Sequence, residues 1–146
     1  MQYKTVLITM ILLFFISGCN ERLQTRKYAS IDENLIVLNK EEIALANRFI
    51  EYWDYRSQHQ FDKSYHYEFP YYCFITPISK YIGESKTNNK AFNNIILSIN
   101  YENLDQTIAW IERKYIKNNF SSIKKDKWIY VNGSWFHQYT SSAFPK

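Results

Sequence analysis

The sequence predicts an α+β domain, with helices in its N-terminal half and antiparallel strands in its C-terminal half. Three local patterns lead to this class. Residues 39–57 combine a helix N-cap with an apolar stripe at helical spacing, and residues 93–101 alternate with a period of two. Asn132-Gly133 is a strong signal for a two-residue β-hairpin turn. Helices followed by a run of hairpin-connected strands are typical of the α+β class.

The first predicted helix begins after Asn39. Glu42 stands three residues later and completes a capping box, and the helix then runs to about Ser57. Its apolar stripe consists of Ile43, Ala46, Ile50 and Trp53, with Phe49 at the edge.

A shorter helix is expected from Asp62, ended by Pro70, because proline interrupts the helical hydrogen-bond ladder. Residues 75–90 contain Pro77, Gly83 and a polar run, and are predicted to be a loop.

The strands are expected to follow in the order of the chain. The first covers residues 93–101 and leads through a turn at 102–106 into a second strand at 107–116. A third begins at 120–123 and is expected to be broken by the charged run Lys124-Lys125-Asp126-Lys127. Residues 128–131 and 134–139 form the predicted final hairpin around Asn132-Gly133.

The N-terminus has the pattern of an export signal. Lys4 precedes an eleven-residue run, 6–16, that is apolar except for Thr9 and is too short to span a bilayer. Ile16-Ser17-Gly18-Cys19 then resembles the lipobox of bacterial lipoproteins, which implies cleavage between Gly18 and Cys19 and lipidation of the Cys19 thiol. An ordinary secretory signal or an uncleaved anchor is the alternative interpretation. We therefore expect a signal peptide at 1–18, a lipid anchor and tether at 19–38, and one domain at 39–146.

This organisation predicts a lipid-anchored protein of the cell envelope. Asn20 follows the lipidated position, and the lack of an Asp there favours the outer membrane in a double-membraned cell. In a single-membrane cell the protein would lie on the outer face of the cytoplasmic membrane. Loss of residues 1–18 removes Lys4 and lowers the formal net charge from +4 to +3, too little to predict nucleic-acid binding. Cys73 is then the remaining free thiol, expected to be a small buried side chain.

Three segments resemble the NTF2-like superfamily, whose members are cone-shaped α+β domains. They are Phe49-Ile50-Glu51-Tyr52-Trp53, Phe61-Asp62-Lys63-Ser64-Tyr65, and the hairpin 127–136 with Trp128, Gly133 and Trp135 in a W-x-x-x-x-G-x-W pattern. The resemblance implies helices packed on a curved antiparallel sheet that encloses a cavity, and the possibility of a homodimer. The segment before Ile95 lacks a clear early strand, so a cystatin-like fold stays open as the alternative.

No catalytic constellation is evident in the sequence. His59, His66 and His137 lack metal-site spacing, so neither a metal nor a cofactor is expected. Asp54 lies at the edge of the apolar stripe and is the best candidate for a cavity base. The candidate cavity residues are Trp53, Asp54, Tyr65, Trp110 and His137, which could instead fill the core.

The expected function is a non-enzymatic binding or docking module for a protein partner in the envelope. The motivating features are the anchor and the lack of a catalytic constellation. The alternative is a binder of a small hydrophobic ligand, or a cavity enzyme of the NTF2-like type. Fold resemblance alone does not choose between them.

Overall fold

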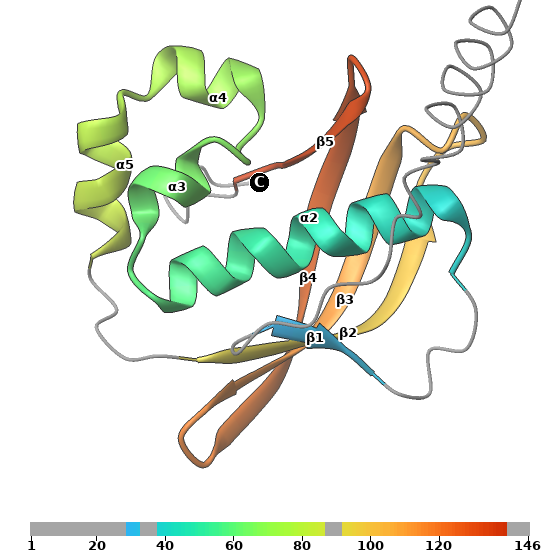
Figure 1. Cartoon of the computed structure of the whole chain (residues 1–146), viewed down its shortest axis with the longest axis horizontal. Helices are drawn as coiled ribbons and strands as arrows, with labels where there is room; N and C mark the ends of the chain where they lie inside the picture. Colours follow the sequence, from blue (N-terminus) through green and yellow to red (C-terminus); the bar gives the residue numbers. More distant parts are fainter. Residues whose placement is uncertain (1–28, 33–37, 87–91, 140–146) are drawn as a thin grey trace, which may run out of the picture.

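The α+β class is confirmed by a computed structural model, which describes residues 29–32, 38–86 and 92–139. A five-stranded sheet in the order β1-β2-β3-β4-β5 curls around a long helix, α2, which crosses its concave side (Figure 1). The strands are β1 Ala29–Ile31, β2 Asn93–Tyr101, β3 Ile108–Lys117, β4 Phe120–Val131 and β5 Ser134–His137. The helices are α2 Lys40–Ser57, α3 Phe61–Tyr65, α4 Pro70–Ile75 and α5 Ile78–Ser85.

The sheet is mixed rather than purely antiparallel. Strands β2 to β5 pair antiparallel, as expected, but β1 pairs parallel with β2 at the edge. Ala29 in β1 is 2% exposed and belongs to the core, and Asp32 N donates to Ile96 O at 2.9 Å. Residues 29–31 therefore extend the sheet, although they fall within the segment expected to be a tether. A strand of three residues is too short to show a periodicity in sequence.

The predicted capping box at the start of α2 is confirmed. The Asn39 side chain accepts from Glu42 N at 2.9 Å, and Glu42 Oε2 accepts from Asn39 N at 2.8 Å. The buried face of α2 is wider than the predicted stripe, because Leu45 and Tyr52 join Phe49 and Ile50 in full burial. A helix enclosed by a curled sheet meets side chains over a broad arc, so more than one stripe becomes buried.

The segment after α2 corrects two predictions. Pro70 does not end a helix but begins α4, and residues 78–85 form α5 where a loop was expected. Proline is tolerated in the first helical turn because its missing N–H would have no intrahelical partner there. Pro77 is the N-cap residue of α5, so it also stands at the start of a helix. Both prolines therefore mark helix starts.

Strand β4 is continuous through the charged run, contrary to the predicted break. Its register places Lys125 opposite Glu112 and Lys124 opposite Arg113. Lys125 Nζ lies 3.5 Å from the Glu112 carboxylate, whereas Asp126 turns inward and is buried. The alternation of a strand thus distributes these charges between solvent and a buried ion pair. The Asn132-Gly133 turn is confirmed, with φ of 50° and 83°.

Candidate functional site

The five predicted cavity residues do not form one site. Trp53 and His137 lie close together in the core, with ring centroids 6.1 Å apart. The buried Asp54 accepts from Gln58 Nε2 at 2.7 Å, and the Tyr65 hydroxyl bonds the Cys73 and Thr76 carbonyls. Trp110 is half-buried on β3, and its indole N–H donates to Glu102 at 2.7 Å.

A buried carboxylate, Glu68, is the centre of the polar interior. Glu68 Oε1 accepts from the Tyr52 hydroxyl at 2.7 Å and from the Tyr81 hydroxyl at 2.8 Å. Glu68 Oε2 lies 2.9 Å from His137 Nδ1, and Arg56 Nη1 lies 4.0 Å from Oε1. We call Tyr52, Arg56, Glu68, Tyr81 and His137 the Glu68 cluster. The Glu68 side chain is 0% exposed, so this carboxylate joins α2, α5 and β5 and is not presented to a ligand.

The two tyrosines of this cluster are held in their neutral form. Burial raises the pKa of Tyr52 well above its usual value, and the Glu68 carboxylate adds to the effect. Burial and the same carboxylate also raise the pKa of Tyr81. Each hydroxyl therefore remains a hydrogen-bond donor to Glu68 in alkaline solution.

We expect the domain to lose stability as the pH rises above about 10, where unfolded tyrosines ionise. A pKa that is higher in the folded state contributes stability that is complete below the unfolded pKa and is lost as the pH rises through the folded value. Each of these tyrosines should lower the free energy of unfolding by about 1.4 kcal/mol for each pH unit above 10. Urea unfolding between pH 8 and 11 measures this slope. The Tyr52→Phe and Tyr81→Phe double variant should reduce this slope without abolishing it, because burial also raises the pKa of Tyr67, Tyr72 and Tyr139. An unchanged slope in that variant would contradict the assignment.

A second buried group links α2 to the sheet. Asp126 Oδ2 accepts from Trp53 Nε1 and from Arg113 Nε, each at 2.8 Å. Arg113 also donates to Asn94, and its guanidinium lies 3.9 Å from the Trp53 ring centroid. The Arg113 charge is therefore neutralised and held in place, and Trp53 is fixed by its N–H.

One cleft adjoins Trp53. It has a volume of about 380 Å³ and lies between the C-terminal ends of α2 and α5 and the sheet. We call it the α5 cleft; its lining residues are Trp53, Arg56, Phe61, Glu84, Ser85, Phe92, Arg113, Tyr115, Phe120, Lys124 and Tyr139. Asp54 and His137 are not among them. Of the predicted cavity residues, Trp53 alone lines this cleft.

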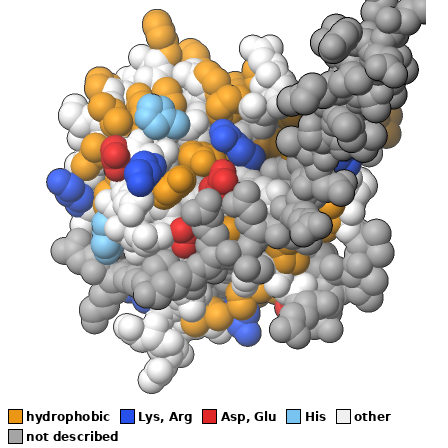
Figure 2. Space-filling model, in the orientation of Figure 1, with side chains coloured by type: hydrophobic (Ala, Val, Ile, Leu, Met, Phe, Trp, Pro, Cys, Tyr) orange, Lys and Arg blue, Asp and Glu red, His pale blue; other side chains and the backbone are white. Residues whose placement is uncertain are grey.

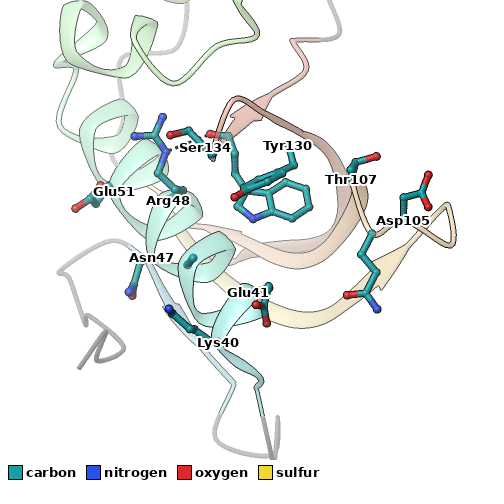
Figure 3. Close-up of a pocket in the computed structure, with 13 residues that line it drawn as sticks. Lys40, Glu41, Asn47, Arg48, Glu51, Asp105, Thr107, Tyr130 and Ser134 are labelled. Atoms are coloured by element: carbon teal, nitrogen blue, oxygen red, sulfur yellow. Dashed lines mark hydrogen bonds between the residues drawn. The ribbon is translucent and has the colours of Figure 1, made fainter. Parts of the chain in front are cut away.

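A larger groove of about 730 Å³ lies between α2 and the tips of the β2–β3 and β4–β5 hairpins. Figure 3 shows its labelled polar side chains along α2 and, on the far side, Asp105 and Thr107, with Tyr130 between them. Arg48 is already engaged there, since Nε donates to Trp135 O at 3.2 Å and the guanidinium lies 4.1 Å from the Tyr67 ring centroid. Cations and carboxylates alternate along this groove, so it presents no field of one sign.

Among the described residues, an exposed apolar surface lies on α4 and the start of α5. None of the six residues of α4 is buried. Phe74 is 86% exposed, Tyr71 65%, Ile75 51% and Ile78 38%. We call these four residues the α4 patch, and Figure 2 shows hydrophobic side chains gathered over this end of the molecule. Apolar side chains grouped on a surface in this way mark interaction sites.

The remaining predicted features show no chemical site among the described residues. Cys73 is half-buried rather than buried, and burial raises the pKa of its thiol, which disfavours a reactive thiolate. Within ranges 29–32, 38–86 and 92–139, no His, Cys, Asp and Glu side chains are grouped to hold a metal ion, and no helix is long and apolar enough to cross a membrane. The predicted cleavage site at Gly18 and Cys19 lies outside the described residues.

Comparison of the chain with models of known protein families, with curated protein sequences and with solved structures gave no match.

Proposed function

We propose that this protein is a lipid-anchored envelope protein whose domain docks non-enzymatically onto a protein partner. The observation that carries the proposal is the α4 patch, in which four large apolar side chains are exposed together. An apolar surface of this kind contributes binding free energy when a partner removes it from water. The buried carboxylates Glu68 and Asp126 are committed to interior hydrogen bonds, which favours a structural role for them over catalysis.

The partner we propose is an uncharged, apolar protein surface. The segment from Phe69 to Ser79 contains no charged residue, and Lys80 is the first beyond it. A surface that binds anionic lipid headgroups would carry several Lys or Arg side chains, each contributing up to about 1 kcal/mol. Tyr and Phe are moreover enriched at the centres of protein interfaces. The charge pattern thus favours a protein partner over the membrane for this face.

The anchor part of the proposal is supported by the sequence Ile16-Ser17-Gly18-Cys19 after its apolar run. Lipidation at Cys19 would place the domain at the outer membrane of a double-membraned cell, or otherwise on the outer face of the cytoplasmic membrane. Ten residues, 19–28, would separate the lipid from β1, and they reach at most about 35 Å when fully extended. Growing the cells with an alkyne fatty acid tests lipidation at Cys19. The wild-type protein should be labelled and the Cys19→Ser protein should not, and equal labelling would contradict the proposal.

For the fold, we propose the NTF2-like cone in preference to the cystatin-like alternative. The support is that α2 lies in the concave side of the sheet while three further helices gather at one end of it. A cystatin-like fold, by comparison, packs a helix on a curved sheet without such a group.

The docking proposal predicts a change of complex size. Wild-type protein, gently extracted from its own membrane, should migrate in a native gel as a complex larger than the lipidated monomer. The Phe74→Ser and Ile78→Ser double variant should migrate as the monomer, because it removes two of the four apolar side chains of the α4 patch. Leu104→Ser is the matched control, since Leu104 is fully exposed on the β2–β3 turn. A complex that survives the double variant, or one made only of two copies of this chain, would contradict the proposal.

A further inference from the structure

We propose that the α5 cleft binds a small organic monoanion, a carboxylate with a flat apolar body, and that Arg56 and Ser85 hold its carboxylate. This site is separate from the α4 patch. It refines the expected alternative of a hydrophobic ligand, because the cleft offers a charge as well as aromatic walls.

Arg56 has hydrogen-bond capacity to spare. Its guanidinium carries five N–H donors. Among the described residues it makes one hydrogen bond, from Nη1 to the Tyr81 hydroxyl at 2.5 Å. The nearest carboxylate oxygen, Glu68 Oε1, is 4.0 Å away and already accepts from two tyrosines. A planar guanidinium with free donors matches the two oxygens of a carboxylate.

The position of Arg56 is fixed before any ligand arrives. Its Cζ lies 5.5 to 5.7 Å from four ring centroids, and its side chain is 14% exposed. Those rings belong to Tyr52, Trp53, Phe61 and Tyr81. An arginine held in this way loses little conformational freedom when it binds, which favours affinity.

Ser85 supplies a second, independent polar group. Ser85 is 6% exposed and is one of the residues that line the α5 cleft, and its buried Oγ has no hydrogen-bond partner in the structure. Buried hydroxyls in native proteins are nearly always paired. An acceptor oxygen in the cleft would give this hydroxyl its partner.

The charges of the cleft fit a single negative charge. Arg113 lines the cleft but is neutralised by Asp126 at 2.8 Å. Arg56 lies 4.0 Å from the buried Glu68 carboxylate and Glu84 lies 4.0 Å from Lys80, so the positive charge that remains in the lining is that of Lys124. One monoanion would balance this charge, whereas a phosphate dianion would bring excess negative charge beside the buried Glu68.

The walls fit a flat apolar body. Trp53, Phe61, Phe92, Tyr115, Phe120 and Tyr139 line the cleft. Trp53 and Tyr115 lie 5.7 and 5.3 Å from the Phe92 ring centroid, so these rings form a continuous aromatic surface. A volume of about 380 Å³ is at the lower end of the range for small-molecule sites.

The test is isothermal titration of the full lipidated chain, in detergent, with 3-phenylpropanoate and with its neutral isostere 3-phenylpropanamide. The carboxylate should bind at least about tenfold more tightly than the amide, because a charge-assisted pair is lost in the amide. Arg56→Lys keeps the positive charge but removes the planar pair of N–H donors that matches a carboxylate. It should weaken carboxylate binding about tenfold. Ser85→Ala makes a smaller change and should weaken it about threefold or more.

Arg48→Lys is the matched control, since Arg48 lies on the same helix outside the cleft and also packs on an aromatic ring. It should leave the affinity within about twofold, as should Phe74→Ser, which separates this test from the docking test. The proposal is overturned if 3-phenylpropanoate does not bind, if the amide binds equally well, or if folded Arg56→Lys and Ser85→Ala proteins both bind like wild type.

Discussion

Replacing Glu68 with alanine is expected to destabilise the domain by about 3–5 kcal/mol, a large fraction of the stability of a typical domain. The substitution removes the acceptor of the Tyr52 and Tyr81 hydroxyls and the partner of His137. The Tyr52 hydroxyl and His137 Nδ1 would be left unpaired, whereas the Tyr81 hydroxyl would keep its bonds to Arg56 and Ser64. Arg56 would lose its nearest carboxylate. Urea unfolding monitored by tryptophan fluorescence measures the loss.

Two further variants separate the buried cluster from surface electrostatics. Glu68→Gln retains an acceptor oxygen and should lie between wild type and Glu68→Ala. Glu112→Ala breaks a solvent-facing pair with Lys125 and should change the stability by less than about 1 kcal/mol. A Glu68→Ala protein as stable as Glu112→Ala would show that the Glu68 cluster contributes little to the fold.

Replacing Asp126 with alanine is the second large expected effect, about 3 kcal/mol or more. Asp126 is 8% exposed and accepts from both Trp53 and Arg113. Its removal leaves a buried guanidinium without a counter-charge, which costs far more than the pair itself contributes. The Trp53 indole N–H would also lose its acceptor.

A double variant tests that explanation. Arg113→Met together with Asp126→Leu removes both charges and should be more stable than Asp126→Ala alone, because no unpaired charge remains. Asp105→Ala, in the exposed β2–β3 turn, serves as the control and should be close to wild type. If the double variant is less stable than Asp126→Ala, the loss arises from packing and the charge argument is wrong.

The parts of the fold that the sequence predicted correctly depend on neighbouring residues. The capping box joins Asn39 to Glu42, and the type I′ turn needs positive φ only at Asn132 and Gly133. Residues 93–101 form β2 as predicted, although its fully buried side chains are Asn94 and Ile96 rather than the alternating Ile95 and Leu97. Each of these signals is complete within a few residues, so it can be recognised without knowledge of the tertiary structure.

The errors share a different physical origin. Pro70 ends or begins a helix depending on the conformation of the residues around it, and Phe69 N donates to His137 O, far away in the chain. The run at 124–127 looked like a break because the buried partner of Asp126 is Arg113 on the neighbouring strand. Tertiary contacts decided both cases, and neither contact is visible in a local pattern.

The candidate sites were harder to predict than the fold. Trp53 lines the α5 cleft, but its neighbours Arg56 and Ser85 belong to no sequence motif. Glu68 follows a short helix and resembles any solvated acid in sequence, although it is buried in the structure. The sequence did not predict the exposed α4 patch, because Pro-Tyr-Tyr-Cys-Phe-Ile has the apolar composition of a core segment. Burial, rather than residue type, distinguishes these groups.

Site-specific photo-crosslinking in living cells tests the docking account most directly. A photoreactive phenylalanine at position 74 should give one discrete adduct with an envelope protein, and the same probe at position 104 should give none. The adduct should disappear when Ile78→Asp places a charge within the α4 patch. Crosslinks to lipid alone, or an identical adduct from both positions, would contradict the claim that the α4 patch is a protein-docking surface.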